Sequence, residues 1–137
     1  KIEDIYVTIQ HGIRADDDDT RFSEMPAFSE MLDGQTVNAI ADFVVATASG
    51  TTANPQGAVA YADNCAICHG DTLKGIRELG APDLADALWL YSASKDEIAA
   101  QIRKPKHGMM PAWDGRLDDS TIRQLALYVH ALGGGKE

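Results

Sequence analysis

Apolar residues recur along this chain at intervals of three and four positions, and no stretch of useful length alternates between apolar and polar residues. The first pattern places apolar side chains along one face of a helix, whereas alternation is typical of strands. The sequence therefore predicts an all-α fold. Helices are expected at the very start of the chain and over about residues 33–48, 55–64, 94–103 and 118–132.

Helix-end signals support these assignments. Asn54 is a candidate N-cap, and Pro55 fits the first helical turn that follows it. Ser94 and Glu97 have the spacing of a capping box, which satisfies two free backbone N–H groups at a helix start. Pro105 then ends that helix, because proline cannot continue the hydrogen-bond ladder.

The last helix is expected to begin after a cap at Asp118 or Asp119 and to stop at the glycines of residues 133–135. Its apolar positions fall on one stripe, which we expect to face a core. That stripe consists of Ile122, Leu125, Val129 and Leu132.

Composition narrows the class of protein. The chain has 137 residues, enough for one ordinary domain or two very small ones, and a formal net charge of −9. Such a charge repels nucleic acid and anionic lipid, and favours either a basic protein partner or simple solubility. No run of about 18 apolar residues occurs in the sequence, so no membrane span is expected within this stretch.

The two cysteines give the strongest chemical signal, because they form the motif Cys65-x-x-Cys68-His69. A disulfide between them would close a tiny loop and add little stability. A thioredoxin-like redox pair would need a surrounding βαβ pattern, and a zinc knuckle would need two more ligands. Two thiols at this spacing can instead bond to the two vinyl groups of one porphyrin, with the imidazole of His69 reaching the iron. The motif therefore predicts one covalently attached haem c.

A haem iron held by His69 also needs a distal ligand. Met110 lies 110 − 69 = 41 residues downstream on a loop fixed by Pro111, and a thioether there would raise the reduction potential. Met109 is the neighbouring alternative, and methionines also serve as plain core residues. Pro82 lies in a rigid turn whose carbonyl would accept the second N–H of His69 and fix the orientation of the ring.

A domain of about 80 residues has a thin core, so the porphyrin would supply apolar volume. Aromatic and aliphatic side chains before and after the motif are expected to wall it. These are Tyr61, Leu84, Leu88, Trp89 and Trp113.

An internal repeat links the two ends of the chain. Adding 85 to the numbering places Met-Pro-Ala-Phe at residues 25–28 on Met-Pro-Ala-Trp at residues 110–113. The apolar residues Val37, Ile40, Phe43 and Val44 then fall on Ile122, Leu125, Tyr128 and Val129. Further upstream, residues 4–9 match residues 97–102 at an offset of 93, which leaves an insertion of 93 − 85 = 8 residues around the acidic run 16–19. That run lacks calcium-loop spacing and is interpreted as a solvated loop.

The repeat predicts a domain organisation. Residues 1–50 correspond to the C-terminal half of a second c-type haem domain, residues 51–54 to a linker, and residues 55–137 to a complete class I cytochrome c-like domain. Met25 would be the distal ligand of the first haem, whose own CxxCH would lie before Lys1 in a longer protein. The alternative is a degenerate half-domain that never bound haem.

The sequence resembles the membrane-anchored di-haem cytochrome c subunit of the cbb-type haem–copper oxidases, called FixP or CcoP. CxxCH with a following methionine is common to small c-type cytochromes, whereas the other shared segments are more specific. The likeness is carried by Cys-Ala-Ile-Cys-His-Gly (65–70), Gly-Ala-Pro-Asp-Leu (80–84), Trp-Leu-Tyr (89–91), Met-Pro-Ala-Trp (110–113), Gly-Ile-Arg (12–14) and Met-Pro-Ala-Phe (25–28).

The resemblance implies an electron carrier rather than an enzyme in its own right, with two tandem haem domains in the bacterial periplasm and an anchor in the inner membrane. It would take electrons from soluble or membrane cytochromes and deliver them to the catalytic subunit of the oxidase. Cys65 and Cys68 would be the thioether sites, and His69 and Met110 the axial ligands. Two alternatives are a haem-based gas sensor and a stand-alone periplasmic di-haem carrier.

Overall fold

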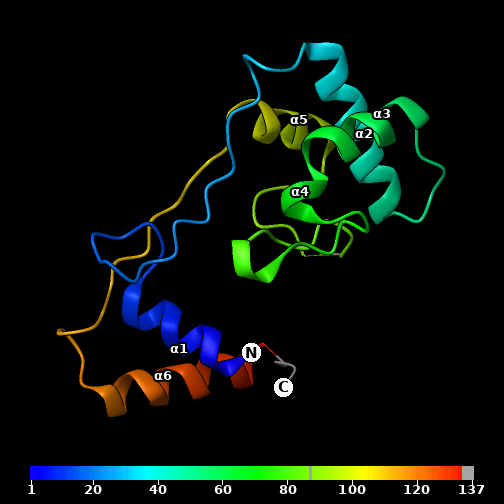
Figure 1. Ribbon diagram of the computed structural model, residues 1–137. Helices are drawn as coiled ribbons and strands as arrows, with labels where there is room; N and C mark the ends of the chain where they lie inside the picture. Colours follow the sequence, from blue (N-terminus) through cyan, green and yellow to red (C-terminus); the bar gives the residue numbers. More distant parts are fainter. Residues whose placement is uncertain (87, 134–137) are drawn as a thin grey trace. The chain divides into compact units, whose positions relative to one another are not determined.

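The computed structural model describes residues 1–86 and 88–133 of the chain, and within them it contains helices and isolated bridges but no strand (Figure 1). The predicted all-α class is confirmed. The α-helices are α1 (Ile2–His11), α2 (Gly34–Ala48), α3 (Pro55–Asn64), α4 (Ala66–His69), α5 (Lys95–Arg103) and α6 (Asp119–Leu132), with a 3-10 turn at Arg77–Leu79.

The helices begin where the cap residues predicted. The side chain of Asn54 accepts the N–H of Gln56 at the start of α3, and that of Ser94 accepts the N–H of Glu97 at the start of α5. Of the two candidates for α6, Asp118 is the N-cap and accepts the N–H of Thr121. The predicted stop at residues 133–135 lies partly outside the described residues.

The chain folds into two compact units. The terminal unit combines Lys1–Glu24 with His107–Glu137, and the central unit consists of Met25–Lys106. This division by packing does not follow the division by repeats, in which residues 1–50 and 55–137 are separate domains. The repeat boundaries describe sequence correspondence and stay a prediction.

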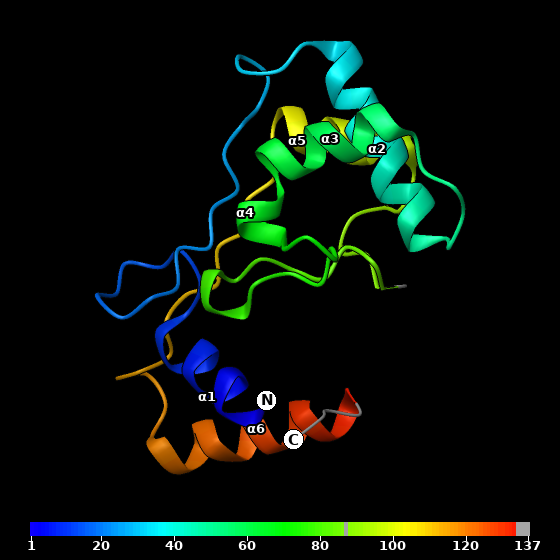
Figure 2. The same ribbon diagram turned by 45° about the vertical axis from the view of Figure 1, so that its right-hand side comes forward.

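The central unit is built around α2, which contacts both α3 and α5 (Figure 2). The linker from α2 to α3 is short, and it begins with a turn in which the N–H of Thr51 donates to the carbonyl of Ala46 at 2.8 Å. Between the two helices the rings of Phe43 and Tyr61 pack with their centroids 5.2 Å apart. The core formed by the three helices includes Val37, Ile40, Ala41, Val44, Tyr61, Ile98, Ala99 and Ile102.

Gly57 allows the close approach of α3 to α2. A Cβ at this position would collide with the carbonyl oxygen of Ala39 and would lie 2.8 Å from the Cβ of Phe43. Since even alanine would force the helices apart, this glycine serves packing rather than flexibility.

In the terminal unit α1 packs on α6, and the small core holds Ile9, Ile122 and Ala126. The stripe predicted for α6 is therefore only partly right. Ile122 is buried, whereas Val129 is 45% exposed and Leu132 is 69% exposed, because α1 covers only one edge of the stripe.

No helix among the described residues is both long enough and apolar enough to cross a lipid bilayer.

Candidate functional site

The Cys65-x-x-Cys68-His69 motif lies at the start of and along the short helix α4 in the central unit. Cys65 is buried, Cys68 is half-buried, and neither thiol takes part in a disulfide. Burial, followed by the neighbouring Cys68 sulfur, raises the pKa of Cys65 to about 11, so its sulfur is a neutral thiol at physiological pH. Two free thiols on one helical turn are the chemical requirement for a pair of thioether bonds.

The imidazole of His69 is held by the turn that the sequence singled out. Its Nδ1–H donates to the carbonyl oxygen of Pro82 at 3.2 Å, because a carbonyl can only accept. Burial lowers the pKa of His69, and the bond to Pro82 opposes that shift only in part. The ring is therefore favoured as a neutral imidazole, whose Nε2 has the lone pair that a metal requires.

Gly75 brings the Pro82 turn to His69, and sequence reasoning missed it. Its N–H donates to the carbonyl of His69 at 2.8 Å, and its backbone has a φ of +75°. A Cβ there would collide with the carbonyl oxygen of Ala81 and would lie 2.7 Å from that of Pro82. The sequence signal that could have identified it is a glycine in a turn shortly after His69, because glycine adopts a positive φ without steric cost.

Two further bonds fix the segment after α4. The hydroxyl of Tyr61 donates to the carbonyl of Gly70 at 2.8 Å, and burial raises the pKa of that hydroxyl well above its usual range. The N–H of Leu84 donates to the carbonyl of Leu73 at 2.7 Å. The residues around His69 are thus tied to α3 on one side and to the Pro82 turn on the other.

The residues predicted to wall the porphyrin differ in their exposure. Tyr61 is buried, and Leu84 and Trp89 pack against the central core as half-buried residues. Leu88 is 85% exposed, and its place in the wall stays a prediction. A local turn explains this exposure, since the carboxylate of Asp86 accepts the N–H of Leu88 at 2.8 Å.

Met25 belongs to the same compact unit as His69. Its side chain is half-buried and packs against the central core. The loop that follows it is tied to α5, because the N–H of Phe28 donates to the carbonyl of Ile102 at 3.1 Å. Residues 25–48 thus contribute to the central unit the loop that contains Met25 and the helix α2, which packs on α3.

Met110 and Trp113 belong to the terminal unit, where both pack against its core. The backbone of Met110 pairs with that of Ile13 through N–H to carbonyl bonds of 3.0 and 2.9 Å. Gly12, whose φ is +69°, lets the two segments meet, since a Cβ there would collide with the carbonyl oxygen of Met110. Arg14 donates from Nε to the carbonyl of Gly108 at 2.6 Å.

The donor set of the central unit fits a haem c. It offers two free thiols, one imidazole whose other nitrogen is already oriented, and the thioether of Met25, which packs against the core of the same unit. Such a set is typical of an iron porphyrin bound by Cys, His and Met, and it lacks the four ligands of a closed zinc site.

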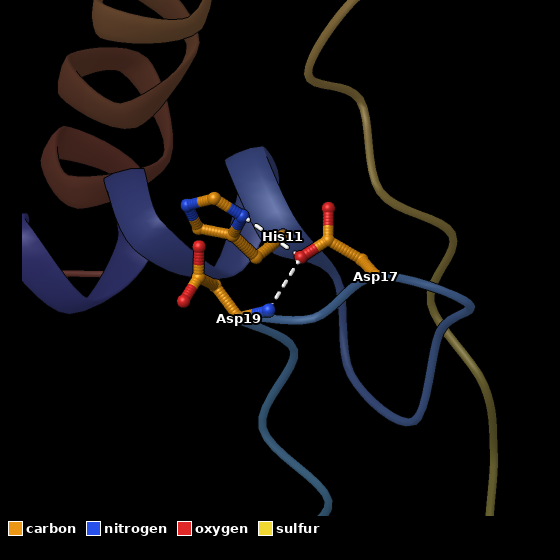
Figure 3. Close-up of side chains that lie close together, drawn as sticks. All are labelled: His11, Asp17 and Asp19. Atoms are coloured by element: carbon orange, nitrogen blue, oxygen red, sulfur yellow. Dashed lines mark hydrogen bonds and ion pairs between the residues drawn. The ribbon is translucent and has the colours of Figure 1, made fainter.

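A second group of metal-binding residue types lies in the terminal unit, in the inserted acidic loop (Figure 3). Ligand atoms of His11, Asp17 and Asp19 all lie within 4.8 Å of one another. Hydrogen bonds account for this closeness, because Asp17 Oδ1 lies 3.0 Å from His11 Nδ1 and accepts the N–H of Asp19 at 2.9 Å. We assign the group no role beyond closing the loop.

Comparison with known proteins agrees with the motif. Residues 52–129 match the family model described as cytochrome C oxidase, cbb3-type, subunit III. The chain is 49% identical over 98% of its length to the cbb3-type cytochrome c oxidase subunit FixPc of Rhizobium leguminosarum bv. viciae, of which it covers 48%. It is 40% identical over 98% of its length to the subunit CcoP of Cereibacter sphaeroides, of which it covers 49%.

The chain therefore spans about half the length of the curated relatives it matches. The family match and the likeness to FixPc and CcoP both include the Cys65-x-x-Cys68-His69 motif, whose surroundings in the central unit fit a haem c. This protein belongs to the family of the subunit III of cbb3-type cytochrome c oxidases.

Proposed function

We propose that this chain is a single-electron carrier with one haem c bound through Cys65 and Cys68 and ligated by His69. The observation that supports the proposal most directly is the imidazole of His69, which is buried, neutral and oriented by Pro82 beside two free thiols. When bound, the haem iron supplies the change between two oxidation states. The chain's own residues would hold the porphyrin in place, set its orientation and shield it from water.

We propose Met25 as the distal ligand of that haem. It packs against the core of the compact unit that contains His69, whereas Met31 of the same unit is 60% exposed, and the bond from Phe28 to Ile102 anchors its loop on α5. Met110 is the alternative that the spacing after His69 favours, and it lies in the other unit. Both are followed by Pro-Ala and an aromatic residue, so their loops can present a thioether in the same way.

In the longer proteins of this family the chain would be part of a di-haem subunit. The relatives FixPc and CcoP are named as subunits of a cbb3-type cytochrome c oxidase and are about twice as long as this chain. We propose that the protein lies in the bacterial periplasm with an anchor in the inner membrane. It would pass electrons from a cytochrome donor to the catalytic subunit of the oxidase, and would not itself be an enzyme.

A gas-sensing cytochrome is the alternative function. In a sensor the distal methionine is displaced by a gas, whereas a carrier keeps both axial ligands in both oxidation states.

One experiment tests the proposal. The chain is matured with haem in a periplasm, and its intact mass and its spectra with and without carbon monoxide are measured. We expect the mass of one haem per chain, and a low-spin spectrum that carbon monoxide leaves unchanged. A colourless protein at the bare peptide mass would contradict haem attachment, and a high-spin iron that binds carbon monoxide readily would support the sensor.

A further inference from the structure

An ion pair lies beside the turn that orients His69. The ammonium nitrogen Nζ of Lys74 lies 3.2 Å from Oδ2 of Asp83, the residue that directly follows Pro82. The other oxygen of this carboxylate, Oδ1, accepts the N–H of Ala85 at 2.7 Å. The side chain of Asp83 is 27% exposed, so the carboxylate is partly withdrawn from water between a cation and the backbone that follows it.

The ion pair joins two segments of backbone that lie side by side, residues 73–75 and residues 81–84. At one end the N–H of Leu84 donates to the carbonyl of Leu73 at 2.7 Å. At the other end Gly75 lies so close to the second segment that a Cβ would collide with it. The pair is placed between these two contacts. The first segment is bonded to the carbonyl of the haem-binding histidine, and the second contains the carbonyl that orients its ring.

The first segment is strained and depends on its surroundings. Leu73 is 1% exposed and has a φ of +61°, which is uncommon for a residue other than glycine. Such a conformation persists where neighbouring contacts hold it in place. Lys74 follows directly, and its partner Asp83 lies on the opposite segment. Without the ion pair, the two segments would separate more readily at this point.

The charge of Asp83 favours this arrangement. Burial works against the ionised form, but the bonds from the N–H of Ala85 and from Lys74 lower the pKa of the carboxyl below its ordinary value of 3.8. An exposed ion pair adds little to the stability of a whole fold, because water screens it and both side chains lose freedom. The effect of this pair is therefore expected in the local geometry of the turn.

From this geometry we propose that Lys74 and Asp83 are positioning residues, which keep the Pro82 carbonyl on Nδ1 of His69. The inference rests on the proposed function, because it takes His69 as the ligand of a haem iron. A carbonyl on the second nitrogen makes the imidazole a stronger electron donor. A stronger donor favours the ferric iron and so lowers the reduction potential. The ion pair thus acts on the potential through a residue that it does not touch.

The test compares variants of the haem-loaded chain. Deuterium exchange of the His69 Nδ1–H is followed by NMR in the reduced protein, and the reduction potential is measured on the same samples. Lys74→Met and Asp83→Asn each remove one charge, while Asp83→Asn keeps an oxygen for the N–H of Ala85. We expect each variant to exchange about fivefold faster and to have a raised potential, because the turn opens more often. The double variant should exchange no faster than either single one, since the two residues act as a pair.

Asp42→Asn is the matched control. Asp42 also forms an exposed ion pair in the central unit, with Lys95 at 2.7 Å, but that pair joins α2 to α5. It should change neither the exchange rate nor the potential.

The inference is overturned if Lys74→Met and Asp83→Asn exchange as slowly as the wild type, or if Asp42→Asn has the same effect as they do. It is also overturned if their effects multiply in the double variant, or if exchange becomes faster with no rise in potential. The intact mass of each sample reports haem attachment. A haem-free wild type would contradict the proposed function, whereas unchanged exchange in haem-loaded variants would contradict the positioning role alone.

Discussion

The N–H of Phe28 donates to the carbonyl of Ile102, and the N–H of Trp113 donates to the carbonyl of Ile9, at 3.1 and 3.2 Å. Phe28 and Trp113 correspond in the repeat at an offset of 85, and Ile9 and Ile102 at an offset of 93. Each methionine loop therefore lies on the helix of the other repeat. This exchange is the reason why we propose Met25, beside Met110, as a candidate for the distal ligand.

The exchange predicts which methionine the iron uses. In the haem-loaded chain, Met25→Ala should abolish the long-wavelength absorption band of a methionine–iron bond and lower the reduction potential, because the iron loses its thioether. Met110→Ala should leave the band in place. Both variants are measured as ferric protein at neutral pH.

The opposite result would assign the ligand to Met110, as the spacing after His69 favours. Met109→Ala is the control for a general effect of losing a methionine, since Met109 is 69% exposed and next to Met110.

Gly75 is predicted to be intolerant of any side chain. In Gly75→Ala the new Cβ meets the carbonyls of Ala81 and Pro82 at a positive φ, so we expect a loss of about 2–4 kcal/mol in the free energy of unfolding. Gly115→Ala is the matched control. Its φ is +74° but no atom lies within 4 Å of a Cβ at this position, so strain alone should cost about 1 kcal/mol. Chemical denaturation of the haem-loaded protein measures both, and equal losses would contradict the prediction.

Val44 and Val129 occupy corresponding positions of the repeat in different surroundings. Val44→Ala removes two methyl groups from a side chain that is 2% exposed, and should cost about 2 kcal/mol of stability. Val129→Ala makes the same change on an exposed surface and should cost under about 0.5 kcal/mol. Thermal unfolding of the two variants is the measurement. A larger loss for Val129→Ala would mean that α6, and not α2, covers α3.

The contribution of Asp119, at the start of α6, to the stability of the fold should depend on pH. The bond from Arg123, followed by the bond from Tyr6, lowers the pKa of Asp119 below its ordinary value of 3.8. A carboxylate with a lowered pKa stabilises the fold above its unfolded pKa, and that contribution is lost as the pH falls through the folded value. The melting temperature of the wild type should therefore exceed that of Asp119→Asn at neutral pH, and the gap should narrow below pH 3.8. Arg123→Gln should narrow the gap at every pH, and a gap independent of pH would refute the pairing.

The net charge of −9 predicts a salt effect on electron transfer. Transfer to a basic partner should slow as ionic strength rises, because salt screens the attraction that guides the encounter. Stopped-flow kinetics with a basic cytochrome measures this dependence. Rates that do not change with salt would mean that the charge serves solubility alone.

Local features of the fold could be predicted from the sequence. The caps at Asn54 and Ser94 were predicted, and that of α6 was narrowed to Asp118 or Asp119, because a cap depends on residues within one turn of it. The contact of His69 with Pro82 was also predicted, since the two are close in sequence and their chemistry is complementary. These interactions involve few competing partners.

The pairing of helices could not be predicted in the same way. Periodicity identifies the apolar face of α2 and of α6, but both faces have the same pattern and either would cover α3. The signal that could have decided between them is the linker of residues 49–54, because consecutive helices joined by a short linker usually pack together. Closing that short loop also costs less entropy than bringing α6 back to α3.

With Met25 as the proposed distal ligand, the exchanged loops reverse an order that is usual in translation. In a haem domain that folds from its own segment, the distal ligand leaves the ribosome after the attachment site. Here Met25 precedes His69 by 69 − 25 = 44 residues. A nascent chain with Met25 as the proposed ligand already carries that thioether when the two cysteines become available for the porphyrin, whereas α5, on which the Met25 loop is anchored, is synthesised later.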